Sequence, residues 1–136
     1  MAVNPLNKKL LIKAGYTVGI FNRPKGYEKL VEPLPVGAMQ GSGIGPFDCV
    51  VCFTGSKAEV DILAPFAIKA LKPGGVLWLC YPKGTSGVKT DINRDKGWDT
   101  LKTAGWEGVA QVAIDEKWTG TRFRPASEIV SKKKSK

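Results

Sequence analysis

The chain has 136 residues, 43% of them hydrophobic and 24% charged, which is the composition of one ordinary globular domain. Its 21 lysine and arginine residues outnumber 12 acidic residues, giving a formal net charge of +9, and it has no histidine, which excludes any mechanism needing an imidazole base or ligand. No apolar run approaches the length of a membrane span, and the first residues lack the apolar core of a signal peptide, so we expect a cytoplasmic protein.

The N-terminal third predicts one strand between short helices. Asn4-Pro5 opens a helix that Gly15 ends, and residues 16–21 (YTVGIF) form the first strand. A loop from Asn22 leads to a second short helix, which is followed by the glycine-rich segment 36–46 (VGAMQGSGIGP). We predict that this segment is a loop with at most one short strand.

The middle of the chain predicts a strand, a helix and a second strand in close succession. Residues 48–53 and 76–81 are near-continuous apolar runs, which are typical of parallel strands buried on both faces. The intervening helix, residues 57–71, begins with a capping box formed by Ser56 and Glu59, and a Lys-Pro-Gly-Gly turn follows it.

The C-terminal part predicts a helix over residues 92–104 that Gly105 ends, and a strand over 109–114. A turn at 115–120 then leads to an antiparallel edge strand at 121–124. The fold class that we predict is a three-layer, Rossmann-like open α/β sheet, mostly parallel and closed by an antiparallel hairpin. Residues 1–130 form this single domain, and the Lys-rich residues 131–136 form a disordered tail.

The three cysteines, Cys49, Cys52 and Cys80, all fall within the predicted strands. Cys49 and Cys52 have the spacing of a metal or redox pair, but positions i and i+3 of a strand point to opposite faces. We therefore predict reduced, packed thiols and no metal site.

Several segments resemble known families. The sequences FDCVV and LKPGGVLWLCYP, with the final hairpin, resemble S-adenosylmethionine-dependent methyltransferases of the Rossmann-like type. The sequences NRPKGY, YPKGTSGVKTDINRD and IDEKWTGTRFRP resemble a family of small bacterial proteins that is known only as a domain of unknown function. The wider resemblance implies a methyltransferase-like sheet shortened by about two strand-helix units between its first and second strong strands.

The resemblance implies S-adenosylmethionine as cofactor, but the motif that would hold it is missing. Such methyltransferases place G-x-G-x-G after the first strand, where this chain has residues 21–26 (FNRPKG). Residues 41–45 (GSGIG) do spell the motif, but they precede a strand and do not open a helix. The acidic residue that would bind the ribose has no clear counterpart either. We therefore predict no bound cofactor and read residues 41–45 as a connector.

Ligands of open α/β sheets bind outside the carboxyl ends of the parallel strands. Four loops meet there in the predicted topology, and their cations, hydroxyl groups and aromatic rings suit a small anionic ligand. The candidate ligand-binding residues are Asn22, Arg23, Lys25, Tyr27, Lys83, Ser86, Lys89, Thr90, Asp91, Arg94, Asp115 and Trp118.

Each candidate also has a structural interpretation. Asp91 or Thr90 would cap a helix that begins at Ile92, Arg94 would pair with Asp91 or Asp115, and Trp118 would pack on the hairpin. The sequence shows no nucleophile with a partnering base, so we name no catalytic residue.

The function that we predict is a non-catalytic or accessory domain that binds a small anion, such as a nucleotide or a phosphorylated metabolite. The alternative is a minimal S-adenosylmethionine-dependent methyltransferase that uses residues 22–27 in place of the glycine loop, with Lys89 and Arg94 holding its substrate. A third reading, a basic protein associated with nucleic acid, rests on the net charge and the tail alone. We expect no membrane partner, and the sequence leaves the oligomeric state open.

Overall fold

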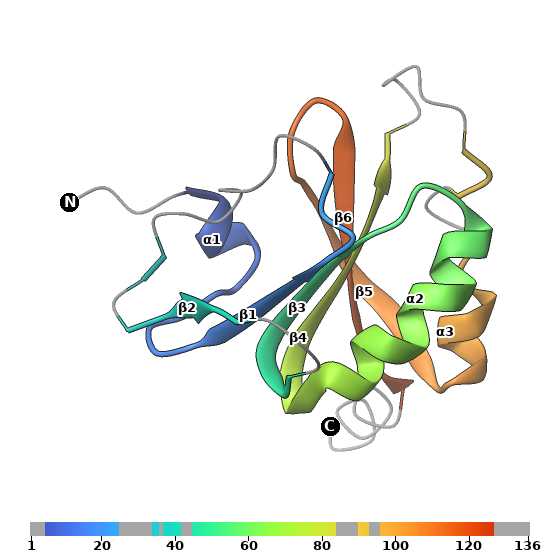
Figure 1. The fold of residues 1–136 in the computed structure, drawn as a ribbon. Helices are drawn as coiled ribbons and strands as arrows, with labels where there is room; N and C mark the ends of the chain where they lie inside the picture. The colour runs from blue at the N-terminus through green and yellow to red at the C-terminus, as the bar shows by residue number, and fades with distance from the viewer. Residues whose placement is uncertain are drawn as a thin grey trace, which may run out of the picture.

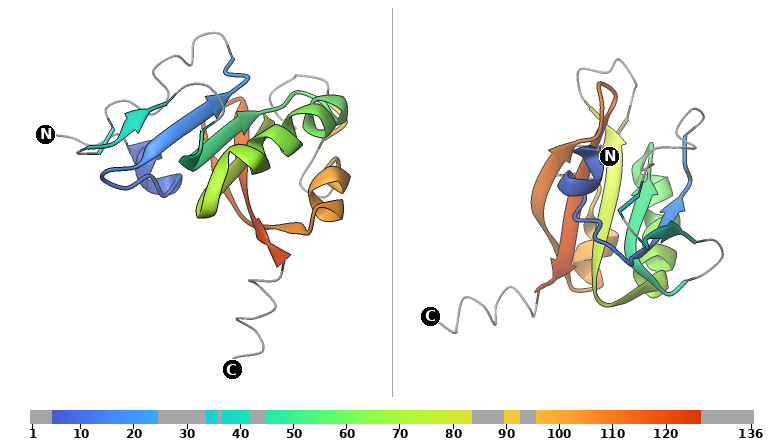
Figure 2. Two further views of the ribbon diagram at one scale, coloured as in Figure 1. Left: turned by 60° about the horizontal axis from the view of Figure 1, so that its bottom comes forward. Right: turned by 90° about the vertical axis from the view of Figure 1, so that its left-hand side faces the viewer.

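The computed structural model describes residues 5–24, 34–35, 37–41, 45–83, 90–92 and 96–126. Its described elements form one open sheet with helices on both faces (Figures 1 and 2). The elements are α1 (Pro5–Lys9), β1 (Thr17–Phe21), β2 (Met39–Gln40), β3 (Phe47–Phe53), α2 (Lys57–Ala70), β4 (Leu71–Pro82), α3 (Asp99–Thr103), β5 (Trp106–Ala113) and β6 (Trp118–Pro125).

The six strands lie in the order β2-β1-β3-β4-β6-β5. The first four run parallel, and β6 is antiparallel to both of its neighbours, β4 and β5. This arrangement confirms the predicted mostly parallel sheet with a C-terminal antiparallel hairpin. The short strand β2 is the one that the glycine-rich segment was expected to allow.

The position of β6 corrects one prediction. Residues 121–124 were expected at the edge of the sheet, but β6 lies inside it and β5 forms the edge. The reason is burial: β6 buries Thr121 and Phe123, whereas β5 has no buried residue. Hairpin pairing alone leaves either strand free to pair with β4, so the choice depends on which strand buries more surface.

The predicted helix over residues 92–104 is also wrong in its length, since α3 comprises only Asp99–Thr103. Gly97 explains the late start, because its φ of +102° lies outside the helical region. Ile92 is buried and non-helical, and it packs against Gly97. The predicted end is confirmed: Gly105 has a φ of +88° and donates its N–H to the Lys102 carbonyl.

Strand β4 begins earlier than predicted, directly after α2. The residues read as a turn form its irregular first part, and the register with β3 shifts between Phe47 and Cys49. Lys72 pairs with Asp48 across this irregularity at 3.3 Å.

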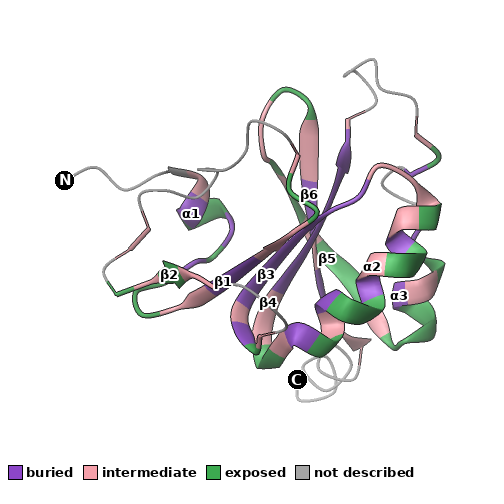
Figure 3. Cartoon of the chain, viewed as in Figure 1, coloured by how far each residue is buried: buried purple, intermediate pink, exposed green. Residues whose placement is uncertain are grey.

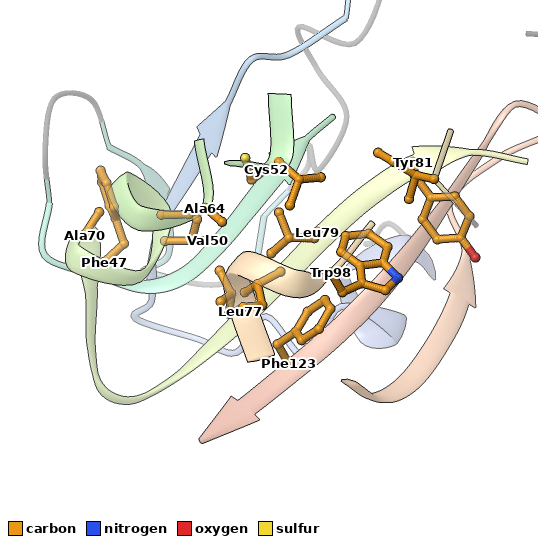
Figure 4. Packing of buried hydrophobic residues seen from close by; sticks show 14 residues of the cluster. Phe47, Val50, Cys52, Ala64, Ala70, Leu77, Leu79, Tyr81, Trp98 and Phe123 are labelled. Carbon is orange, nitrogen blue, oxygen red and sulfur yellow. The ribbon is translucent and has the colours of Figure 1, made fainter. Parts of the chain in front are cut away.

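The sheet buries a separate apolar cluster on each face. Its central strands, β3 and β4, are largely buried, as Figure 3 shows. Helices α2 and α3 cover the larger cluster, in which the Trp98 ring lies between Tyr81 and Phe123 with centroid distances of 5.6 and 5.2 Å (Figure 4). Helix α1 covers the other cluster. Trp78, from β4, belongs to it and donates its indole N–H to the Leu10 carbonyl at 2.9 Å. No helix in the described ranges is long and apolar enough to cross a bilayer.

The three cysteines are fully buried, as predicted. Cys52 faces the cluster beneath α2, whereas Cys49 and Cys80 face the cluster beneath α1. Burial raises the pKa of all three thiols, that of Cys52 to about 12, so they are protonated and inert near neutral pH.

Candidate functional site

The carboxyl ends of β1, β3 and β4 meet at one edge of the sheet, the upper edge in Figure 1. The tip of the β5–β6 hairpin lies at the same edge, because the Lys83 N–H donates to the Lys117 carbonyl at 2.8 Å. We call this region the carboxyl edge; its described residues are 22–24, 40–41, 54–57, 83, 90–91 and 114–118. The structure thus places the described parts of the four predicted loops at one edge of the sheet.

Asn22 directly follows β1 and adopts a left-handed backbone conformation with a φ of 54°, which asparagine tolerates better than most residues. Its side-chain amide donates to the Phe53 carbonyl at 2.9 Å and to Glu59 Oε1 at 3.4 Å. The same Glu59 oxygen accepts the Gly55 N–H at 2.6 Å. Asn22 therefore ties the end of β1 to the end of β3, which is a structural task.

The N-terminus of α2 is capped from two directions. Ser56 Oγ accepts the Glu59 N–H at 3.3 Å, as the capping box predicted. Asp91 Oδ1 accepts the Lys57 N–H at 2.7 Å. The expectation that Asp91 caps a helix at Ile92 is thus wrong, because no helix begins there and the carboxylate caps α2 instead. Thr90 Oγ1 accepts the Ile92 N–H at 3.2 Å within an irregular segment.

Arg23 lies on the side of the carboxyl edge nearest β2. Its guanidinium contacts Gln40 Oε1 at 3.4 Å. Gln40 is the last residue of β2, and β2 pairs with the first residues of β1, so Gln40 lies opposite Val18. Gln40 was not among the predicted site residues, although the short strand that residues 36–46 were expected to allow places it at a strand end.

The hairpin tip carries two of the predicted residues in structural roles. One Asp115 carboxylate oxygen accepts the N–H groups of Lys117 and Trp118 at 2.8 and 2.9 Å, which closes the turn. The half-buried Trp118 ring packs edge-to-face on Phe53, with a centroid distance of 5.0 Å. This packing matches the structural interpretation of Trp118.

The cation of Lys57, also at this edge, is paired with Asp61 at 3.0 Å. The hydrogen bond and charge of Asp61 raise the pKa of the Lys57 ammonium. Asp61 also accepts a hydrogen bond from Thr100, which links α2 to α3. Five of the predicted site residues, Lys25, Tyr27, Ser86, Lys89 and Arg94, lie outside the described residues.

Gly41 and Gly45, the described glycines of residues 41–45, have a packing role that the sequence did not reveal. A Cβ on Gly41 would stand 2.6 Å from the Phe47 ring, and one on Gly45 would stand 2.9 Å from the same ring. Gly19 of β1 contacts this ring too. The segment was read as a connector, and at both described ends it also provides room for a buried aromatic side chain.

Two hollows lie away from the carboxyl edge. The first, of about 800 Å³, runs along β5 on the side of α3 and includes Trp98, Lys102 and Gln111 in its wall. The second, of about 590 Å³, lies at the opposite end of the sheet, between the start of β4 and the end of β6. We call it the amino-edge hollow. Within the described ranges, no group of cysteine or acidic residues could hold a metal ion.

Comparison with known proteins identifies the fold. No family model and no curated protein matches the sequence. Among solved structures, a ribosomal protein L11 methylase from Lactobacillus delbrueckii subsp. bulgaricus aligns with 87% of this chain and 73% of its own, at 11% identity and a TM-score of 0.56. This is a methyltransferase-like fold.

Two further structures agree. A SAM-dependent methyltransferase from Aquifex aeolicus covers 87% of this chain and 86% of its own, at 14% identity and a TM-score of 0.53. A fibrillarin from Aeropyrum pernix with natively bound S-adenosyl-L-methionine covers 83% and 68%, at 12% identity and a TM-score of 0.52. The resemblance to the small bacterial family rests on the quoted segments alone.

The described residues of the carboxyl edge fit the polar half of S-adenosylmethionine. The Gln40 amide can both donate to and accept from a hydroxyl group, and Arg23 and Lys83 are cations suited to a carboxylate. Gly55, just after β3, leaves its surroundings open, since a Cβ there would meet Glu59 Oε1 only at 3.4 Å. The apolar wall that an adenine ring needs is not evident among these residues.

Proposed function

We propose that this chain is a small methyltransferase that binds S-adenosylmethionine at the carboxyl edge. The observation that supports the proposal is the fold: the six-stranded sheet, with the antiparallel β6 between β4 and β5, aligns over most of its length with solved methyltransferases. S-adenosylmethionine supplies a methyl group on a sulfonium sulfur, which a nucleophile on the substrate takes.

Different residues of this chain would bind different parts of the ligand. Gln40 stands where it would meet the ribose hydroxyls, and Arg23 would meet the carboxylate of the methionine portion. The backbone after β1 is held in place by Asn22, so this loop would replace the glycine loop without needing the same flexibility. Lys89 and Arg94 would hold the methyl acceptor, as the sequence hypothesis has it.

A second candidate is non-catalytic binding of a small anion, such as a nucleotide or a phosphorylated metabolite, at the same edge. The observation that favours it is the Arg23–Gln40 contact, which puts a cation and a neutral amide at the end of β2 where a ribose-binding carboxylate would otherwise stand. An extra cation favours phosphate over a ribose hydroxyl.

Calorimetric titration with S-adenosylmethionine and with ATP distinguishes the two candidates. The methyltransferase proposal predicts micromolar binding of S-adenosylmethionine, and about 2.7 kcal/mol of stabilisation at a hundredfold excess over the dissociation constant. The variants Gln40→Ala and Arg23→Gln should each weaken the binding of S-adenosylmethionine at least tenfold. The matched control Lys69→Gln, an exposed cation in the last turn of α2, should not. Binding of ATP alone would support the second candidate and refute the first.

A further inference from the structure

The amino-edge hollow lies where β4 and β6 stop pairing with each other, at this end of the sheet. Their pairing runs from Pro82 and Trp118 to Leu77 and Phe123. Beyond that point, the first residues of β4 turn toward β3, where Leu71 pairs with Phe47. The last residues of β6 stay with β5 instead. The separation leaves the hollow of about 590 Å³ between the two strands.

All charged residues among the described lining of this hollow are cations. Lys13, Lys72, Arg122 and Arg124 line it, and no carboxylate is among its described lining residues. Two of the four have an acidic neighbour just outside, since Lys72 pairs with Asp48 and Arg124 stands in register opposite Glu107. Among the described residues, the wall therefore carries more positive than negative charge.

Of these four cations, Arg122 is the one whose positive charge is least compensated by residues on the neighbouring strands. Its cross-strand partners are Trp78 on β4 and Ala110 on β5, neither of which carries a charge. Arg124 follows two positions later on the same face of β6. Burial, with the like charge of Arg124, lowers the pKa of the Arg122 guanidinium.

The rest of the wall suits a compact organic ligand. Tyr16 and Trp106 contribute aromatic rings, and Leu71 and Val76 contribute apolar surface. At Gly74, which has a φ of +78°, a Cβ would meet nothing within 4 Å, so the backbone at the rim is open. A hollow of this volume is the size of typical small-molecule sites. Guanidinium groups bind phosphoryl oxygens through two parallel hydrogen bonds.

We propose that the amino-edge hollow binds a phosphorylated small molecule of nucleotide size, with its phosphoryl oxygens on Arg122 and Arg124. This site lies at the opposite end of the strands from the carboxyl edge, so it is independent of the proposed S-adenosylmethionine site. Lys13 and Lys72 supply further positive charge, and Trp106 or Tyr16 lies against the organic part.

The test compares two double variants that remove the same charge. Arg122→Gln with Arg124→Gln removes the two arginines of the hollow and leaves Lys13 and Lys72, whereas Lys8→Gln with Lys102→Gln removes exposed cations of α1 and α3 that do not line it. ADP and inorganic pyrophosphate are titrated calorimetrically at 0.15 M salt. We expect both probes to bind the wild type and the control, and to bind the arginine variant at least tenfold more weakly.

The free arginine variant loses a like-charge pair but also the Arg124 charge opposite Glu107, so the two effects on its melting temperature oppose each other. If it fails to fold, Gly74→Asp and its isosteric control Gly74→Asn replace it. Both side chains tolerate a left-handed backbone, but only aspartate adds a negative charge at the rim. We then expect weaker probe binding to the aspartate variant than to the asparagine variant.

Three outcomes would overturn the proposal. The first is the absence of ADP and pyrophosphate binding to the wild type at millimolar concentration, and the second is equal loss in the arginine and lysine variants. The third is a loss of ADP and pyrophosphate binding in Arg23→Gln, which would place the phosphate site at the carboxyl edge. A single-stranded oligonucleotide that outcompetes ADP in a steeply salt-dependent way would replace the small molecule with nucleic acid. S-adenosylmethionine titration of the arginine variant tests the other site separately and should give the wild-type result.

Discussion

Replacing Gly41 by alanine tests whether the glycine-rich segment before β3 serves packing or ligand binding. The added Cβ would stand 2.6 Å from Cε1 of Phe47 and 2.8 Å from Cγ2 of Thr17, whereas ordinary contacts are 3.4–4 Å. Phe47 is 2% exposed and fills a site between β1 and the end of α2, so its ring has little room to retreat. We therefore expect the substitution to destabilise the protein.

The magnitude follows from two opposing effects. Overfilling a packed core costs about 1–3 kcal/mol. Alanine also lowers the entropy of the unfolded chain relative to glycine, which returns about 0.4–1 kcal/mol. The difference is a loss of roughly 0–2.6 kcal/mol, centred on about 1.3 kcal/mol. At that centre, the melting temperature of a chain of this size falls by roughly 4–7 °C.

Urea unfolding of four variants gives the measurement. Gly55→Ala is the matched control, because its Cβ would meet only Glu59 Oε1 at 3.4 Å, and its stability should stay within about 0.5 kcal/mol of the wild type. Phe47→Leu, alone and combined with Gly41→Ala, completes a double-mutant cycle. Since leucine lacks the ring edge, the pair should show a coupling of at least about 0.5 kcal/mol.

Two results would refute this reasoning. One is an additive cycle, which would mean that Gly41 and Phe47 do not contact each other closely. The other is unchanged stability of Gly41→Ala with loss of S-adenosylmethionine binding, which would make the segment a ligand loop after all.

Three further predictions concern single contacts. Asp48→Asn should lower the melting temperature at pH 7, and the difference should vanish as the pH falls below about 4; the bond from the Thr17 N–H, with Lys72 nearby, lowers the pKa of this carboxyl, so its stabilisation is present above that range and lost as it protonates. Asp91→Ala should cost about 0.5–2 kcal/mol in urea unfolding through the lost cap on Lys57, and Asp91→Asn should recover most of it. The native thiols should resist a disulfide reagent at pH 8, and all 3 should react once guanidinium unfolds the chain; rapid labelling of the folded protein would contradict their burial.

Features that depend on neighbours along the chain were predictable from the sequence. The apolar runs at residues 48–53 and 76–81 formed parallel strands, because central strands buried on both faces need apolar side chains at successive positions. The capping contact between Ser56 and Glu59 depends on a spacing of three residues. The opposite orientation of Cys49 and Cys52 follows from the two-residue period of a strand. The mostly parallel fold could be assembled from these local features.

Features that depend on contacts between distant residues were decided by the tertiary structure. Which hairpin strand lies inside the sheet depends on how much surface β6 buries against β4, and the pattern of either strand alone does not contain that quantity. Asp91 caps a helix that begins 34 residues earlier, although its sequence context pointed to the helix after it. The four cations of the amino-edge hollow come from segments spread between residues 13 and 124. They share a wall only because β4 and β6 diverge there, and no local pattern encodes where two strands stop pairing.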